Sequence, residues 1–239
     1  MNEKAKKIES LKFDFACFGY EPGRPVFESM TIDLPVGQNV FVSGPPLTGK
    51  STFLRMLAVL VQPEAGKFFV NGVDTSQMSF EEFLPYRLGI GYSFDMSGLF
   101  SNRFLIDNLT LASLYHKYCP REEAEARARA LAEDFGFTKL LGHRPAAVPG
   151  GLRKLVSVLR AFMTSPEMLV LDDPFTGLDG DACAKLIKLI ETRREMGEIK
   201  HLFMTARHPA IPAQLKCVDI VIDHGTARFE GESKWKVAV

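Results

Sequence analysis

One stretch of the chain constrains its fold more than any other: Asn39-Val40-Phe41-Val42-Ser43-Gly44-Pro45-Pro46-Leu47-Thr48-Gly49-Lys50-Ser51. Its first five residues are rich in side chains that favour β-structure, so they predict a short strand that leads directly into a glycine-containing loop. Behind the loop, apolar residues recur at helical spacing from Phe53 to Leu60 or Val61, and Pro63 ends the predicted helix. A strand, a glycine loop and a helix in this order predict the first unit of an α/β fold.

The loop has the pattern Gly-x-x-x-x-Gly-Lys-Ser, which is typical of loops that wrap phosphate groups with backbone N–H groups at the N-terminus of a helix. We expect Lys50 to reach the β- and γ-phosphates of a nucleotide, the Ser51 hydroxyl to bind Mg²⁺, and Thr52 to contact the α-phosphate. The candidate nucleotide-binding residues here are Gly44, Pro45, Pro46, Leu47, Thr48, Gly49, Lys50, Ser51 and Thr52. The pattern indicates a P-loop nucleotide binder without telling which kind.

A second candidate segment is an apolar run that ends in two acids, Leu169-Val170-Leu171-Asp172-Asp173. An aspartate at the end of a buried strand is the usual second half of a P-loop site. We expect Asp172 to hold Mg²⁺ through its water shell and Asp173 to lie next to the attacking water. The alternative, two acids that only cap a strand, is weakened by the residues that follow them, Pro174-Phe175-Thr176-Gly177-Leu178-Asp179.

The composition is that of an ordinary globular protein and argues against several functions. The chain has 239 residues, enough for one large domain or a core with a smaller lobe, and 46% of them are hydrophobic and 24% charged. Lysine plus arginine equals aspartate plus glutamate at 29 each, which gives no support to a nucleic-acid binder. None of the four cysteines forms a Cys-x-x-Cys pair, so a zinc site is not expected.

No apolar run approaches the ~18–20 residues that a membrane-spanning helix needs. The N-terminus has no apolar run of the kind found in signal peptides. The sequence therefore predicts a cytoplasmic protein, and if it works at a membrane it must dock on other subunits.

The order of elements predicts an α/β fold. Alternation over 11–15 predicts a strand with one buried face, and Asn71-Gly72 predicts a hairpin turn. The region from about Phe83 to Phe162 is more helical. Continuous apolar strands then alternate with a helix, which favours a parallel sheet covered on both faces. These later elements are expected at Met168–Leu171, Asp181–Met196, His201–Met204 and Asp219–Ile222.

Three motifs in order resemble those of the ABC ATPases. The segment 171–179 looks like the family's Walker B and D-loop, Val148-Pro149-Gly150-Gly151-Leu152-Arg153-Lys154 resembles its Leu-Ser-Gly-Gly-Gln signature, and Arg160-Ala161 stands where the family has an Arg-Ala pair. The resemblance spans about Leu11 to Gly231. It implies one domain over 1–239, a P-loop α/β ATPase core with an antiparallel β lobe and a helical lobe at roughly 83–162.

The resemblance also implies partners and ligands. Two subunits of this family pair head to tail as a homodimer or heterodimer, and each Mg-ATP lies between one P-loop and the partner's signature. Here Gly150 and Gly151 would supply that signature contact. An aromatic residue ahead of the P-loop normally stacks on adenine; Tyr20 matches best and Phe18 is the alternative. For either residue, a place in the core is an equally good interpretation.

The segment Gly89-Ile90-Gly91-Tyr92-Ser93-Phe94-Asp95, followed by Leu99-Phe100, resembles the family's Q-loop. In transporter subunits of the family this segment contacts the transmembrane permease, so the resemblance implies a peripheral position on the cytoplasmic face of a membrane. The Phe-x-x-x-x-Leu-Phe form, together with Asp-Pro-Phe after Asp172, is closest to the lipid-trafficking Mla or Mce type. This resemblance implies lipid transport as one candidate function, whereas the sequence itself does not name the cargo.

Several positions depart from the family pattern. Asp173 stands where the family has its catalytic glutamate, Asp95 where it has the Q-loop glutamine, and Pro149 where it has the signature serine. Leu152 and Leu47 replace a glutamine and a glycine. The switch histidine is either absent, with Ala206 at its position, or supplied by His208, for which a surface-loop histidine is an equal alternative. The candidate catalytic residues are Asp173, Asp95 and His208.

These departures leave two interpretations. The chain is either a working transport ATPase, in which Asp173 is an adequate base, or a degenerate switch subunit that binds Mg-ATP, hydrolyses it slowly and pairs with a competent ATPase. An aspartate is one methylene shorter than a glutamate, and misplacement near 1 Å can cost ~100-fold in rate. A small-molecule kinase is disfavoured because it has no use for Val148-Pro149-Gly150-Gly151. An ABC protein of DNA repair is disfavoured because the chain has no long heptad insertion and no basic excess.

Overall fold

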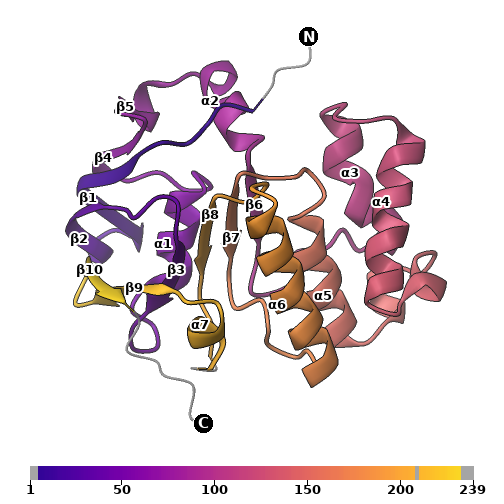
Figure 1. Cartoon of the computed structure of the whole chain (residues 1–239). Helices are drawn as coiled ribbons and strands as arrows, with labels where there is room; N and C mark the ends of the chain where they lie inside the picture. The colour runs from indigo at the N-terminus through magenta and orange to yellow at the C-terminus, as the bar shows by residue number, and fades with distance from the viewer. Residues whose placement is uncertain (1–4, 208–209, 233–239) are drawn as a thin grey trace.

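Two β-sheets lie side by side in the computed structural model, which describes residues 5–207 and 210–232 (Figure 1). The smaller sheet is antiparallel, with strand order β2-β1-β4-β5, and forms the β lobe. Its strands are β1 Leu11–Glu21, β2 Arg24–Asp33, β4 Ala65–Val70 and β5 Val73–Asp74. The alternating burial of β1 confirms the strand predicted over 11–15, and positive φ angles at Asn71 and Gly72 confirm the predicted turn.

The larger sheet is mainly parallel, with strand order β10-β9-β3-β8-β7-β6. Only β10, at one edge, pairs antiparallel to its neighbour. The strands are β3 Asn39–Ser43, β6 Ile90–Ser93, β7 Met168–Leu171, β8 His201–Met204, β9 Val218–Asp223 and β10 Thr226–Glu232. The strands predicted at 39–43, 168–171, 201–204 and 219–222 are thus confirmed, and the parallel sheet with them.

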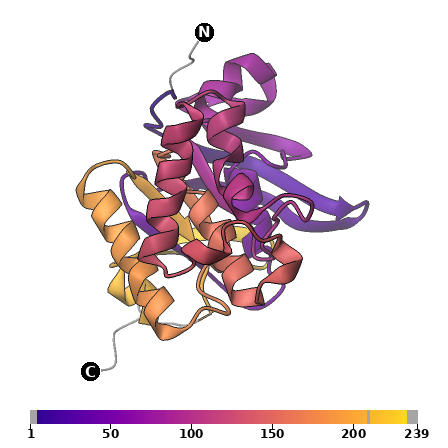
Figure 2. The ribbon, with the colours of Figure 1, turned by 90° about the vertical axis from the view of Figure 1, so that its right-hand side faces the viewer.

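Helices cover both faces of the parallel sheet, and a group of helices lies beyond it on the side away from the smaller sheet (Figures 1 and 2). The α-helices are α1 Lys50–Leu57, α2 Phe80–Arg87, α3 Leu105–Tyr115, α4 Arg121–Asp134, α5 Gly150–Arg160, α6 Gly180–Glu195 and α7 Ala210–Gln214. Short 3-10 helices lie at Thr75–Gln77, Thr138–Leu140 and Pro145–Ala147. Within the described ranges, no helix is long and apolar enough to cross a membrane.

The two faces of the parallel sheet contribute to different cores, because successive side chains of a strand point in opposite directions. In β7, Met168 and Val170 pack toward α1 and the β lobe, whereas Leu169 and Leu171 pack toward α5, α6 and α7. All of these side chains are fully buried. A third core joins α3, α4 and α5 in the helical lobe.

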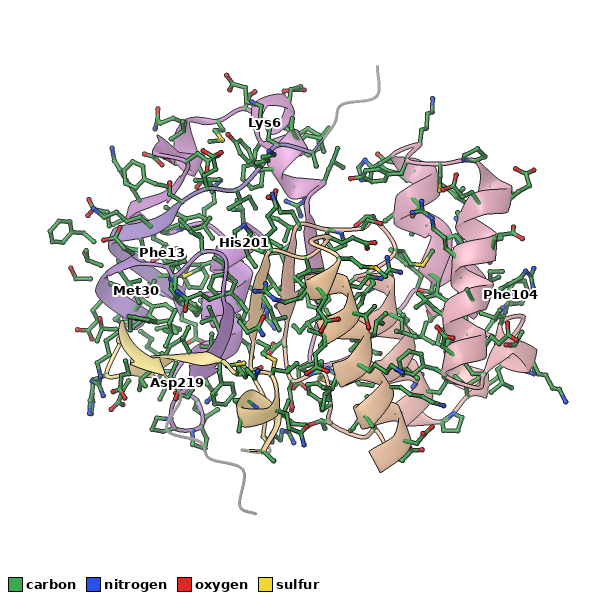
Figure 3. The ribbon with its side chains drawn as sticks, viewed as in Figure 1. Lys6, Phe13, Met30, Phe104, His201 and Asp219 are labelled. Carbon is green, nitrogen blue, oxygen red and sulfur yellow. The ribbon has the colours of Figure 1, made fainter. Side chains whose placement is uncertain are left out.

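Aromatic side chains fix the β lobe against α1. The ring of Phe13 in β1 lies 4.3 Å from that of Phe68 in β4 and 5.6 Å from that of Phe53 in α1, measured between centroids. All three rings are buried, and Figure 3 shows Phe13 and Met30 on the side of the molecule opposite Phe104 of the helical lobe. This packing holds the first turn of α1, and with it the loop that precedes α1, in a fixed place.

The helix behind the loop is shorter than its apolar spacing predicts. It ends at Leu57, well before Pro63, because Ala58 leaves helical geometry and Val59 takes a positive φ of 51°. Leu60 and Val61 are therefore outside the helix, although Val61 still packs against the core. The helix predicted to end at Pro63 was too long, because the chain turns back toward β4 as soon as the apolar face of α1 is buried.

Strand β6 lies inside the interval 83–162 but belongs to the parallel sheet, where it pairs with β7. Gly91 allows this, since a Cβ at that position would lie 2.2 Å from the backbone oxygen of Ala161 just after α5. The helical elements α3, α4 and α5 that follow β6 form the helical lobe. The close approach at Gly91 ties the edge of the sheet to the end of α5.

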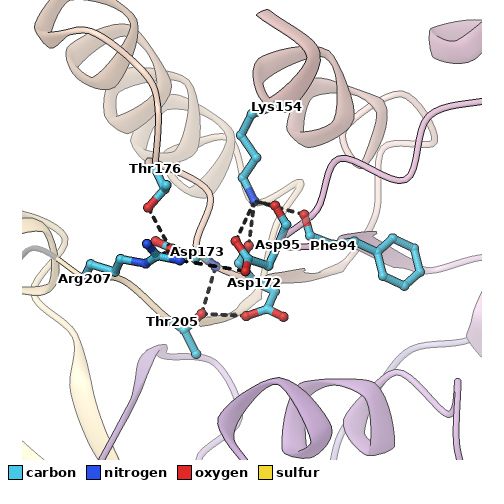
Figure 4. Close-up of polar contacts among 8 residues, drawn as sticks. All are labelled: Phe94, Asp95, Lys154, Asp172, Asp173, Thr176, Thr205 and Arg207. Atoms are coloured by element: carbon cyan, nitrogen blue, oxygen red, sulfur yellow. Dashed lines mark hydrogen bonds and ion pairs between the residues drawn. The ribbon is translucent and has the colours of Figure 1, made fainter. Parts of the chain in front are cut away.

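Lys154 joins the helical lobe to the sheet. It lies on the buried face of α5, with 6% of its surface exposed, and its ammonium donates to the backbone oxygens of Phe94, Asp95 and Asp172, each at 2.9 Å (Figure 4). Burial lowers the pKa of this lysine, an effect that the nearby Asp95 carboxylate opposes. One side chain thus connects α5, the segment after β6 and the end of β7.

We predict that Lys154→Met lowers the free energy of unfolding by about 2 kcal/mol, because three carbonyls lose a charged donor and at least one of them is buried. Denaturant-induced unfolding of the purified chain measures this value. The matched control is Lys185→Met on α6, which removes an exposed ion pair with Asp181 and should change stability by less than about 0.5 kcal/mol. Equal unfolding free energies for the two variants would contradict the role given to Lys154.

Candidate functional site

The glycine loop connects β3 to α1 through backbone conformations that few residues adopt. Gly44 has φ 138° and Gly49 has φ 99°. A Cβ at Gly44 would lie 2.1 Å from the backbone oxygen of Ile222 in β9, and one at Gly49 would lie 2.4 Å from a methyl group of Val26. Both glycines are therefore required by close packing and by φ. Leu47 also has a positive φ of 65° and its side chain is fully exposed.

Lys50 closes the loop on itself. Its ammonium donates to the backbone oxygen of Gly44 at 2.9 Å and to that of Pro45 at 2.6 Å. Partial burial lowers the pKa of Lys50, and the negative charge of Asp172 opposes this shift. The Thr48 hydroxyl donates to the same Pro45 oxygen at 2.9 Å. A lysine held at the mouth of the loop can redirect its charge to an anion without unfolding anything else.

An open pocket of about 350 Å³ lies beside the loop and is lined by Tyr20, Val26, Leu47, Gly49, Lys50, Ser51 and Thr52. Tyr20 is 55% exposed, whereas Phe18 is 7% exposed. The Tyr20 hydroxyl accepts from Arg55 at 3.0 Å and lies 3.3 Å from the Thr52 hydroxyl. Of the two aromatic candidates, Tyr20 thus presents a ring to the pocket and Phe18 packs in the core.

The two acids after β7 are joined by one hydroxyl of the neighbouring strand. The Thr205 hydroxyl donates to the Asp172 carboxylate at 2.9 Å and accepts the backbone N–H of Asp173 at 2.8 Å (Figure 4). Burial raises the pKa of Asp172, and hydrogen bonds from the Ser51 and Thr205 hydroxyls oppose this effect. Asp172 therefore lies against the first turn of α1, next to the candidate phosphate loop.

Asp173 is held by a different set of partners. It has a positive φ of 46°, which turns its carboxylate away from that of Asp172. The Thr176 hydroxyl donates to it at 2.7 Å, and the Arg207 guanidinium lies 2.7 Å from the same oxygen. Asp95 completes the acid cluster: its carboxylate lies 3.9 Å from the Lys154 ammonium and 3.9 Å from the Arg207 guanidinium.

Four residues of this cluster are missing from the sequence-based site: Lys154, Thr176, Thr205 and Arg207. Thr176 lies three residues after Asp173, within the segment 171–179. A signal existed for Lys154, because it stands four residues before Val158 and seven before Ala161 on the apolar face of a predicted helix. The other two follow β8, and their relevance depends on β8 pairing with β7. That neighbour relation is a property of the sheet and not of the local sequence.

The predicted signature glycines and the two candidates for the switch histidine are not part of the pocket beside the loop as the structure describes it. Gly150 and Gly151 begin α5 and do not line the pocket beside the loop in the part of the chain that is described. A Cβ at Gly151 would lie 2.4 Å from the backbone oxygen of Gly177. Ala206 packs against the core that contains α6, and His208 lies outside the described residues.

A groove of about 520 Å³ runs between the β6 side of the sheet and the helical lobe. Its lining combines aliphatic side chains with aromatic and basic ones, among them Tyr92, Tyr115, His116, Tyr118, Arg87 and Arg160. A smaller hollow continues from it to Phe94 and Phe100, and Tyr115 and Phe100 are 76% and 50% exposed. This groove thus leads from the surface of the helical lobe to the segment that contains Asp95.

Comparisons with known proteins agree with this geometry. The family model described as ABC transporter matches residues 27–176, which is more than half of the chain. The L-cystine transport system ATP-binding protein TcyN of Escherichia coli is 29% identical over 215 residues, which cover 86% of each protein. The molybdate/tungstate import ATP-binding protein WtpC of Thermococcus kodakarensis is 30% identical over 169 residues, covering 70% of this chain but only 49% of that protein.

The chain thus spans about half the length of the first two curated relatives that it matches and 86% of the length of TcyN. Among solved structures, the dimeric ATP-binding cassette MJ0796 bound to ADP and phosphate superposes with a TM-score of 0.82 at 21% identity, covering 95% of this chain and 99% of that one. This likeness confirms the predicted fold class, an α/β P-loop core with an antiparallel β lobe and a helical lobe. The chain belongs to the ABC transporter family, and its fold is that of the family's ATP-binding domain.

Proposed function

We propose that the chain binds Mg-ATP at the pocket between Tyr20 and the glycine loop and couples this nucleotide to a membrane permease. The observation that carries the proposal is the convergence of Lys50, Ser51 and Asp172 at one edge of the parallel sheet. A lysine and a row of backbone N–H groups suit phosphates, and the exposed Tyr20 ring suits a purine base. Membership of the ABC transporter family and the ATP-binding names of the relatives support the same ligand.

The oxygen atoms of Ser51 and Asp172 suit Mg²⁺, which prefers oxygen ligands and usually keeps several of its waters. Ser51 follows β3 and Asp172 follows β7, and the pairing of both strands with β8 brings this hydroxyl and this carboxylate to the same edge of the sheet. Asp172 is nearly fully buried, so a cation there would have few competing charges from solvent. When bound, Mg²⁺ would neutralise part of the phosphate charge.

Two kinds of protein partner are proposed. The groove lined by Tyr115 and Arg160, which continues to Phe100, is an apolar and basic hollow of the size needed by a short segment of a permease. The exposed N-terminus of α5, with Gly150 and Gly151, can supply a backbone cradle to the nucleotide of a second ATP-binding subunit. The solved MJ0796 cassettes are described as dimers, which supports such pairing.

More specifically, we propose that the transporter to which this chain contributes carries a lipid. This proposal rests on the Phe94-x-x-x-x-Leu99-Phe100 segment and on the Pro174-Phe175 pair after the two acids. The relatives are named for other cargoes, among them molybdate, cystine and macrolides. A permease, and not the ATP-binding domain, contacts the cargo, so the cargo is best tested on the assembled transporter.

A second candidate function is a nucleotide-controlled switch that hydrolyses ATP slowly. Asp173, at the position of the family's glutamate, has one carboxylate oxygen that contacts both the Thr176 hydroxyl and the Arg207 guanidinium, so this oxygen is occupied and less free to accept a hydrogen bond from an attacking water. Pro149 also supplies no hydroxyl where the family has serine. In this function ATP acts by stabilising a closed dimer with a competent ATPase subunit.

We predict that Lys50→Ala weakens Mg-ATP binding by about 10- to 100-fold, since each hydrogen bond from a charged group to phosphate is worth about 1.5–3 kcal/mol. Isothermal titration of the purified chain measures the affinity, and removal of Mg²⁺ with EDTA should weaken binding of the unaltered chain as well. Lys185→Ala, an exposed lysine of α6, is the matched control. Equal affinity in all three proteins would contradict the proposed site.

Replacement of Tyr20 tests the base-binding part of the site. We predict that Tyr20→Ala weakens Mg-ATP binding by about tenfold, because stacking of a base on an aromatic ring is worth about 1–3 kcal/mol. Tyr20→Phe should keep most of the affinity, since it removes only the hydroxyl that contacts Arg55 and Thr52. The control is Phe229→Ala on β10, another half-exposed aromatic. Loss of affinity in Tyr20→Phe equal to that in Tyr20→Ala would assign the effect to the hydroxyl network instead.

Hydrolysis by the same samples separates the two candidate functions. If the chain is a switch, its turnover lies below about 1 per second and Asp173→Glu raises it by up to ~100-fold, because the longer side chain reaches the water. Asp173→Asn should abolish the remaining activity, and Asp181→Glu on the surface of α6 is the matched control. Brisk turnover by the unaltered chain, lost in Lys50→Ala, would select the working ATPase.

A further inference from the structure

An arginine that is not among the predicted site residues lies against the acid cluster. Arg207 lies three residues after β8, with Nε 2.7 Å from an Asp173 carboxylate oxygen and an Nη 3.9 Å from Asp95 (Figure 4). Its side chain is 71% exposed, whereas that of Asp173 is 9% exposed. The guanidinium therefore covers the carboxylate from the solvent side.

The cationic side chains near the acid cluster differ in how freely they can move toward a ligand. The Lys154 ammonium is buried and donates to three backbone oxygens, so it cannot follow a ligand. The Lys50 ammonium donates to the backbone oxygens of Gly44 and Pro45 and so closes the glycine loop. Arg207 is long and exposed, and among the residues that the structure describes its guanidinium is held by the carboxylates of Asp173 and Asp95, so it can change partners by rotating its side chain.

A nucleotide bound at this site would need a nearby cation to balance its charge. Strand β3 pairs with β8 and β8 with β7, so the glycine loop, Arg207 and the two acids follow their strands at the same edge of the sheet. The phosphate end of a nucleotide held by Lys50 would therefore approach Asp172 and then Asp173, which the Thr205 hydroxyl joins. The terminal phosphate of ATP would meet the carboxylates of Asp173 and Asp95, and like charges at this range repel. A guanidinium that already lies between these two acids is placed to compensate, and its planar fork matches phosphate oxygens.

We propose that Arg207 recognises the terminal phosphate of ATP, exchanging its contact with Asp173 for a contact with that phosphate. This inference rests on the proposed function and adds a specificity-determining residue to it. The exchange has two consequences. It favours ATP over ADP, which lacks the phosphate that Arg207 contacts, and it releases the Asp173 carboxylate only when the terminal phosphate is present.

The test is isothermal titration of the full chain with two probes in the presence of Mg²⁺: ADP and the non-hydrolysable ATP analogue with an imido bridge between its last two phosphates. We expect Arg207→Ala to weaken binding of the analogue by about tenfold or more while ADP affinity changes less than twofold. Arg207→Lys keeps the charge but loses the planar fork, so its affinity for the analogue should lie between that of the unaltered chain and that of Arg207→Ala. Arg228→Ala on β10, which removes another exposed arginine–carboxylate pair, is the matched control.

Thermal unfolding of each variant checks that the fold is retained. An equal loss of affinity for the analogue and ADP would overturn the proposal and make Arg207 a structural residue. Unchanged or tighter binding of the analogue would overturn it too, since Arg207 would then only shield Asp173. If the unaltered chain bound neither nucleotide, the proposed function itself would fail; if it bound both and only the Arg207 effect were absent, the proposed function would stand without this inference.

Discussion

The parallel pairing of β7 with β8 is the constraint on which the candidate site depends. Backbone hydrogen bonds set Leu171 beside Met204, so the chain leaves both strands at the same edge of the sheet. Thr205 then lies between Asp172 and Asp173 and contacts both. The pairing of β3 with β8 brings the glycine loop to this edge as well. A shift of one residue in either pairing would reverse the side chains and separate the carboxylates from the loop.

Two of the residues that depart from the family pattern are carboxylates, and neighbouring cations balance their negative charge. Asp95 and Asp173 stand at positions where the family has other residues, and both lie close to cations, Lys154 and Arg207. Lys154 also connects α5 to the end of β7, so the same residue that balances the acid cluster holds the helical lobe against the sheet. One buried ammonium thus contacts the segment after β6, the carboxylate of Asp95 and the end of β7.

Much of the fold is predictable from local patterns in the sequence. The strand at Asn39–Ser43, the glycine loop and the turn at Asn71-Gly72 follow from side-chain preferences that act within a few residues. The length of α1 does not, because its end depends on where the β lobe requires the chain to turn. The place of β6 in the parallel sheet, within an otherwise helical region, depends on contacts with β7 and with the end of α5.

The candidate site also contains residues that local sequence predicts and residues that only the folded structure brings together. The sequence alone determines the strand, glycine loop and helix order that predicts a P-loop site with Lys50, Ser51 and Asp172, because their chemistry and the elements around them are local. Only the tertiary structure decides that Tyr20 and not Phe18 faces the pocket, that Lys154 is buried against three carbonyls, and that Arg207 pairs with Asp173. These contacts join residues 30 or more positions apart, or depend on burial. A pattern along the chain records the side chains but not the distances that folding gives them.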